Sequence, residues 1–154
     1  MAGNTAMLTI EMRRLITDHT AGMVATINDN GTPSVSPKAT FVIVDDRTVA
    51  FGNIRSPGTL ANLRQRPAVE VCFIDVLARK AVRVTGTATI VEKDEAGTGL
   101  ASAFEAVWAE YVPYMSAFVV IAVSAAELIL SPAYDLDYTE EELRSINLAK
   151  LNTL

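Results

Sequence analysis

The alternation of apolar and polar side chains between Ala81 and Val91 restricts the fold of this chain more than any other feature of its sequence. One face carries small or apolar residues, namely Val82, Val84, Gly86, Ala88 and Ile90. The opposite face carries Arg83, Thr85, Thr87 and Thr89. Because successive side chains of a β-strand point to opposite faces, this period of two predicts a strand with one face in a core and the other outside it.

Five further segments have the composition of short strands and are joined mostly by tight turns. They are residues 23–27, 34–44, 48–52, 69–75 and 117–123. Helices are expected over residues 8–18, 56–66, 96–111 and 138–151. Six short strands with peripheral helices predict a six-stranded antiparallel barrel of the α+β class, mainly β, in a single domain over residues 1–154.

Composition and charge exclude several classes of partner and site. The formal net charge is −5 and basic residues are scattered, so a nucleic-acid partner is not expected. No apolar run reaches the ~18 residues that a transmembrane helix needs, and no secretory signal pattern opens the chain. Cys72 is the only cysteine and His19 the only histidine, which is too few for a zinc site. We therefore expect a cytoplasmic protein with no membrane partner and no metal.

The junction from Phe51 to Leu63 joins the end of an apolar strand to the start of a helix. Ser56 is a preferred N-cap residue, and Pro57 suits the first helical position. A helix that begins there leaves backbone N–H groups unpaired at its positively polarised tip, next to Arg55. The pattern is compatible with an ordinary capped surface helix and with an anion site that would take a phosphate group.

The segment from Ser34 to Phe41 places a proline inside an otherwise strand-like sequence. Because Pro37 cannot donate to a strand ladder, it indicates an edge, a bulge, or a place where something other than a strand lies alongside. A planar heterocycle is one such neighbour. Lys38 is accordingly either a solvated lysine or a cation at the electron-rich edge of a ring.

Three other features have ordinary structural explanations. Arg83 and its row of threonines are expected to face water or, if the barrel packs against a copy of itself, an interface that contributes to a ligand site. Trp108 and Tyr111 have a helical spacing that is typical of core or interface packing. His19 follows the first helix, where a structural role is expected.

The order of these features resembles that of the pyridoxamine 5'-phosphate oxidase-like FMN-binding split barrels. The resemblance rests on Ser36-Pro37-Lys38, the strand from Asp45 to Asn53, the helix entry from Arg55 to Leu63, the strand from Val82 to Gly86, and the ending from Ser131 to Leu143. It covers roughly residues 8 to 145. It implies a six-stranded split β-barrel that forms a homodimer, with FMN in a groove between the subunits.

The resemblance also implies a set of cofactor contacts, matched by position. The residues along the isoalloxazine edge would be Ser36, Pro37, Lys38, Ala39 and Thr40. The residues around the phosphate and the ribityl chain would be Asn53, Arg55, Ser56, Thr59 and Asn62. Arg83 is a further candidate for the phosphate end, and Trp108 for the side of the flavin that the partner subunit covers. No side chain is predicted to be catalytic.

The sequence departs from true pyridoxamine phosphate oxidases at several positions. Pro57-Gly58 replaces the basic pair that follows the serine, Ala81 replaces a glutamine, and residues 146–154 contain neither Arg nor His. We therefore expect an FMN-dependent oxidoreductase that acts on an unidentified small molecule, not on vitamin B6. The alternatives are a non-catalytic flavin-binding or redox-sensing module, and the same fold with a deazaflavin or haem.

Overall fold

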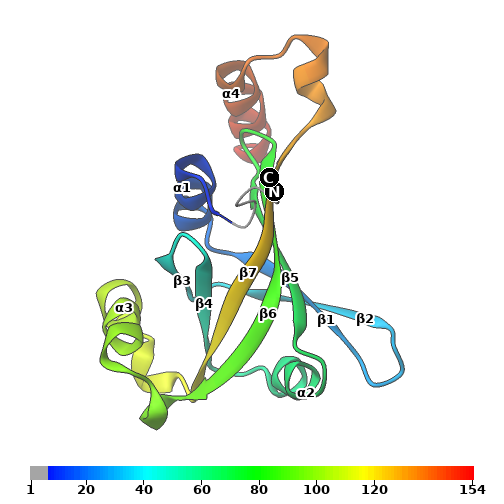
Figure 1. Ribbon diagram of the computed structural model, residues 1–154. Coiled ribbons are helices and arrows are strands. Elements are labelled where there is room, and N and C mark those ends of the chain that lie inside the picture. The colour runs from blue at the N-terminus through cyan, green and yellow to red at the C-terminus, as the bar shows by residue number, and fades with distance from the viewer. Residues whose placement is uncertain (1–6) are drawn as a thin grey trace.

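The computed structural model describes residues 7–154, which fold into strands, four α-helices and short 3₁₀ segments (Figure 1). The strands are β1 (Gly22–Ile27), β2 (Pro33–Lys38), β3 (Phe41–Asp45), β4 (Thr48–Asn53), β5 (Ala68–Asp75), β6 (Lys80–Glu92) and β7 (Ala117–Leu130). The helices are α1 (Ile10–Asp18), α2 (Pro57–Gln65), α3 (Thr98–Trp108) and α4 (Glu140–Leu151).

The strands of residues 7–154 form one antiparallel sheet in the order β2-β1-β5-β6-β7-β4-β3. The long hairpin of β6 and β7 runs through the middle of the sheet, with α3 near one end of it and α4 at the other (Figure 1). The fold class expected from the sequence, an α+β antiparallel split barrel, is confirmed.

The prediction of six strands is wrong by one, because residues 34–44 form two strands instead of one. These two strands, β2 and β3, are consecutive in the chain but lie at opposite edges of the sheet. Pro37 lies in edge strand β2, opposite Met23 of β1, where a residue without an N–H is tolerated. Ala39 and Thr40 therefore connect the two edges, and we call this connection the seam.

Two hydrogen bonds between Thr40 and Gly52 hold the seam against β4. The Thr40 hydroxyl donates to the Gly52 carbonyl at 2.8 Å, and the Gly52 N–H donates to the Thr40 carbonyl at 3.1 Å. Gly52 leaves no room for a side chain, since a Cβ atom there would lie 2.2 Å from Met115 Sδ. The end of β2 is thereby brought next to the end of β4, which leads into α2.

β7 is longer than the strand expected over residues 117–123. It pairs with β6 along the whole of its length, from Ala117 opposite Glu92 to Leu130 opposite Lys80. The burial of its second half does not alternate cleanly, and the ladder shifts register between Thr85 and Gly86 of β6. Pairing with β6 extends β7 beyond its predicted end, and the sequence of residues 117–130 alone does not reveal this pairing.

Two apolar clusters position the outer elements. The first fills the barrel and includes Phe41, Phe51 and Phe73. The second packs α3 against the outside of the sheet, where the Phe104 ring stacks on Phe118 with centroids 4.3 Å apart. Helix α3 ends at Trp108, before its predicted end at Tyr111. Trp108 and Tyr111 therefore both lie where the chain leaves α3.

The last helix begins as its sequence predicts. In α4, Thr139 and Glu142 form a reciprocal capping box: the Thr139 hydroxyl accepts from the Glu142 N–H, and the Glu142 carboxylate accepts from the Thr139 N–H. In the part of the chain that the structure describes, no helix is long and apolar enough to cross a membrane.

Candidate functional site

A cavity of about 290 Å³ lies at the seam, between the end of β2, the start of α2 and the end of α3. We call it the seam cavity. It is lined by Pro37, Lys38, Ala39, Thr40, Gly52, Ile54, Arg55, Ser56, Trp108 and Tyr111. The structure therefore brings together, around one opening, most of the residues near the seam that the sequence nominates for a flavin.

The seam cavity has a positively charged lining. Lys38 and Arg55 are its two cations, and among the described residues no carboxylate lines it. Burial lowers the pKa of the Lys38 ammonium group. The Lys38 Nζ atom donates to the Ser36 hydroxyl, and Ser36 itself does not line the cavity. In a protein of net charge −5, this lining favours an anionic ligand.

The start of α2 supplies further donors at the same opening. Ser56 occupies the N-cap position and Pro57 the first turn, as predicted, but the Ser56 hydroxyl makes no capping hydrogen bond. The hydroxyl is therefore available to a ligand, together with the N–H groups of the first helical turn. Ser56 and Arg55 both line the seam cavity, so a hydroxyl and a guanidinium group face it beside the start of α2.

Four of the nominated residues make their contacts elsewhere. Asn53 is buried: its Nδ2 donates to the Ser116 hydroxyl at 2.9 Å, while its Oδ1 has no partner among residues 7–154. Thr59 is also buried, on the inner side of α2. Arg83 lies on the exposed face of β6, where it pairs with Glu127 at 2.5 Å.

Asn62 lies on the side of α2 that packs against β1. Its Nδ2 donates to the Thr26 hydroxyl and to Asn28 Oδ1, both at 3.0 Å. These bonds fasten α2 to the first hairpin and leave Asn62 outside the lining of the seam cavity. Both hydrogens of Nδ2 are used in these bonds, so a ligand contact of Asn62 would be made through its Oδ1 atom.

An aromatic corner forms one wall of the seam cavity. Trp108 Nε1 donates to the Phe41 carbonyl at 2.8 Å, which ties the end of α3 to the start of β3. The Tyr111 ring lies 5.9 Å from the Trp108 ring and is inclined to it by 69°. Tyr111 was not predicted from the sequence to be a site residue. Its spacing of three residues from Trp108 could have predicted that the two side chains lie on the same side.

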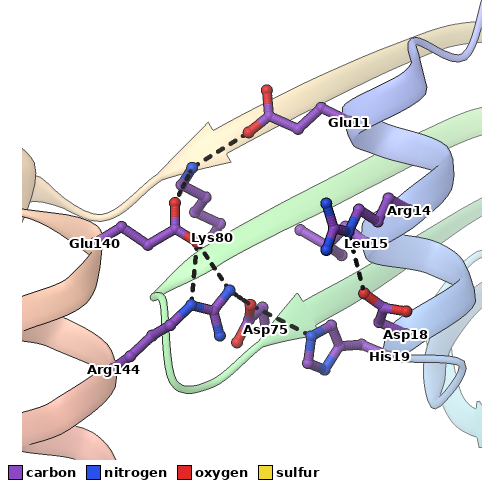
Figure 2. Close-up of a pocket in the computed structure, with 9 residues that line it drawn as sticks. All are labelled: Glu11, Arg14, Leu15, Asp18, His19, Asp75, Lys80, Glu140 and Arg144. Atoms are coloured by element: carbon purple, nitrogen blue, oxygen red, sulfur yellow. Dashed lines mark hydrogen bonds and ion pairs between the residues drawn. The ribbon is translucent and has the colours of Figure 1, made fainter.

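A second cavity, of about 500 Å³, lies among α1, α4 and the turn between β5 and β6 (Figure 2). Its charged side chains form what we call the ionic cluster: Glu11, Arg14, Asp18, His19, Asp75, Lys80, Glu140 and Arg144. Sequence reasoning nominated none of these for a site, and it expected a structural role for His19.

Asp75 is the centre of the ionic cluster and is 4% exposed. Its Oδ2 atom accepts from Arg144 of α4 at 2.6 Å and lies 3.3 Å from His19 Nε2 at the end of α1 (Figure 2). Its Oδ1 atom accepts the N–H groups of Leu77 and Ala78, each at 3.0 Å. One buried carboxylate therefore connects two helices and a hairpin turn.

Lys80 repeats this arrangement with the opposite charge. Its Nζ atom lies 2.9 Å from Glu140 of α4 and 3.2 Å from Glu11 of α1. The charges of the ionic cluster are thus matched within it, and the cluster fastens α1 and α4 to the barrel. We assign it a structural role.

The ionic cluster predicts a loss of stability in acid. Burial alone raises the pKa of Asp75, but hydrogen bonds from Ala78 and Arg144 and the charge of His19 outweigh burial and hold the pKa below its usual range. Hydrogen bonds from Lys80 and Arg144 lower the pKa of Glu140. Both groups therefore stabilise the fold above their ordinary pKa values of about 4, and this contribution is lost as the pH falls through the lowered values.

Urea denaturation at a series of pH values between 7 and 2 measures this effect. The free energy of unfolding should change little down to about pH 5 and then fall, because the unfolded chain binds more protons below that point. Glu140→Gln should lower stability at neutral pH and flatten the decline. An equally steep decline in this variant would contradict the assignment of Glu140.

Comparison with known proteins relates this geometry to a family. The family model described as pyridoxamine 5'-phosphate oxidase matches residues 8–131. HupZ from Group A Streptococcus is 26% identical, with a TM-score of 0.70 over 81% of this chain and 96% of that one. Two further structures share the fold: an FMN-binding protein from Syntrophomonas wolfei subsp. wolfei (13% identity, TM-score 0.62, 77% and 84% of the two chains) and an F420 reductase (19%, 0.55, 70% and 88%). No curated protein matches this chain.

Proposed function

The chain belongs to the pyridoxamine 5'-phosphate oxidase family, and we propose that it binds FMN at the seam cavity and acts as an oxidoreductase on a small molecule. The observation that carries this proposal is the charge of the cavity. Two cations, a free hydroxyl and the start of a helix face one opening that no described carboxylate lines. Arg55, the Ser56 hydroxyl and the start of α2 suit a phosphate monoester, and Lys38 adds a second cation to the same opening.

The residues fit FMN in a defined orientation. Arg55, Ser56 and the first-turn N–H groups of α2 would hold the phosphate. Lys38 and the seam backbone at Ala39 would then face the edge of the flavin ring. FMN itself supplies the electron-transfer chemistry, while the chain binds and orients it and excludes water. No acid or base from the chain is needed for that role.

We also propose that two copies of the chain share each site. The seam cavity, at about 290 Å³, lies at the lower end of the range for complete ligand sites, so a neighbouring surface is needed to enclose a molecule as long as FMN. The outer face of the sheet offers one, since Met23, Val35 and Ile74 are exposed there. Apolar side chains gathered on one face are typical of an interface.

Vitamin B6 oxidation is not part of this proposal. The chain has Pro57-Gly58 at the position of the basic pair and Ala81 at the position of the glutamine. A deazaflavin is the second candidate cofactor, because an F420 reductase shares the fold. A deazaflavin has a longer anionic tail than FMN and would need a more basic site. Two cations in the lining of the seam cavity suit the shorter tail of FMN better. Competitive titration with the two cofactors separates these cases.

The proposal is tested by titrating the purified protein with FMN, with light scattering to measure its mass. We expect FMN absorption to remain with the protein after desalting, at one FMN per chain of a dimer. A protein that does not retain FMN at micromolar concentrations would not support the proposal.

Arg55→Ala should weaken FMN binding by about 1–3 kcal/mol, or roughly five- to 150-fold, because a charge-assisted contact to the phosphate is lost. Arg64→Ala is the matched control: Arg64 lies on the same helix, lines no part of the seam cavity and faces Glu92 at 3.4 Å. Equilibrium titration of flavin fluorescence measures both. Equal affinity in the two variants would place the phosphate elsewhere.

A further inference from the structure

The chain that leads from β4 into α2 has no polar attachment of its own. Ile54 and Arg55 join the end of β4 to the N-cap residue Ser56, and neither makes a hydrogen bond or an ion pair with a described residue. The contacts of α2 itself therefore decide where Ser56 and the N–H groups of the first helical turn lie at the seam cavity.

The apolar contacts of α2 hold it on the barrel without fixing its direction. Leu60 and Leu63 are buried in the barrel core, and apolar burial has no directional preference. The hydrogen bonds from Asn62 Nδ2 to Thr26 Oγ1 and Asn28 Oδ1, both 3.0 Å long, are directional. Thr26 is 4% exposed, so one of the two acceptors is fixed on the buried face of β1.

Arg66 makes a second attachment where α2 ends. Its Nε atom donates to the Ile27 carbonyl at 2.9 Å, and its Nη2 atom pairs with the Asp29 carboxylate at 2.6 Å. The polar partners of both attachments thus lie within residues 26–29. These residues belong to the first hairpin, residues 22–38, which contains β1 and β2.

The first hairpin also carries another part of the seam cavity. Its second strand, β2, ends at Lys38, which lines the cavity as Ser56 does. Asn62 and Arg66 therefore join the two elements that end in these two lining residues. A change in the direction of α2 would move Ser56 relative to Lys38, and binding that uses both residues is sensitive to such displacements.

We propose that Asn62 and Arg66 are positioning residues for FMN, because by joining α2 to the first hairpin they set the separation of Ser56 and Lys38 across the seam cavity. This inference rests on the proposed function, since it takes the seam cavity to hold FMN. Arg66 acts without touching the cofactor: roughly 15 Å of helix separates it from Ser56, which is more than a Debye length at physiological salt.

Thr26→Val tests the first attachment and leaves α2 and the cavity lining unchanged. Valine fills the buried position of Thr26 but offers Asn62 no acceptor. FMN should bind about three- to tenfold more weakly, which is the affinity equivalent of one neutral hydrogen bond. Thr26→Ser keeps the hydroxyl and should bind FMN within about twofold of the parent. Equilibrium titration of flavin fluorescence measures both variants.

Arg66→Met removes the second attachment and should weaken FMN binding about two- to fivefold, a smaller factor because Asp29 is 92% exposed. Thr26→Val binding FMN as tightly as the parent would overturn the role of Asn62. An unchanged affinity in Arg66→Met would overturn that of Arg66.

Glu140→Gln separates positioning from a general loss of stability. It should lower stability through α4, which lies at the other end of the β6–β7 hairpin from α3 (Figure 1). Its affinity for FMN should equal that of the parent, and an equal weakening in Glu140→Gln and Thr26→Val would overturn the proposal. A parent protein that takes up no FMN overturns the proposed function instead, and titration of the parent reports this before any variant is compared.

Discussion

Gly86→Ala is expected to destabilise the protein by about 3 kcal/mol, at the upper end of the usual cost of overpacking. A Cβ atom at this position would lie 2.4 Å from the Ala122 carbonyl oxygen and 2.7 Å from Ile121 Cγ2. The oxygen is a backbone atom of β7, so it cannot rotate away as a side chain would. Relief requires a shift in the β6–β7 ladder, at the point where its register already changes between Thr85 and Gly86. Urea denaturation at pH 7 measures the loss.

Gly99→Ala is the control for this prediction. Gly99 lies in the first turn of α3, and a Cβ atom there would meet no atom within 4 Å. The substitution removes freedom from the unfolded chain at no packing cost, so stability should be unchanged or rise by up to about 1 kcal/mol. If Gly86→Ala instead unfolds at the same urea concentration as the parent, the hairpin accommodates the methyl group and the packing explanation is wrong.

The sequence predicts an element well where one local pattern determines it. β6 follows from its alternation, because only a strand with one buried face places every second side chain in a core. Pro37 indicates an edge or a bulge for a similar reason, and it lies in edge strand β2. The capping box at Thr139 predicts the start of α4 from a contact between residues three apart.

Contacts between distant segments could not be predicted from local patterns in the sequence. Asp75 and Arg144 are 69 residues apart, and neither is unusual in its own segment, so the ionic cluster could not be predicted. Asn62 follows the helix-tip pattern, yet its side chain faces Thr26 of β1 because of how α2 packs on the barrel. Tyr111 joins the seam cavity only because α3 ends beside the seam.

Asp75→Ala is expected to lower the free energy of unfolding by about 3 kcal/mol and to loosen α4 before the barrel unfolds. Removing this carboxylate leaves the Leu77 and Ala78 N–H groups without their acceptor and Arg144 without a counter-ion on the barrel. The estimate is at the low end for a broken buried pair, because Arg144 is 42% exposed and regains water. Urea denaturation measures the total loss in the free energy of unfolding, and hydrogen exchange shows which elements lose protection.

Two further substitutions separate charge from hydrogen bonding at this position. Asp75→Asn keeps an oxygen for the hairpin N–H groups but loses the ion pair, so it should cost less than Asp75→Ala and still raise exchange in α4. Asp18→Ala is the matched control on the cavity rim: its carboxylate is 58% exposed and lies 3.7 Å from Arg14, so its loss should change stability by less than about 1 kcal/mol. Unchanged protection of α4 in Asp75→Ala would mean that its other contacts suffice to hold it, namely the Lys80–Glu140 ion pair, the Asn147 hydrogen bonds and the burial of Leu143, and that Asp75 does not fasten it.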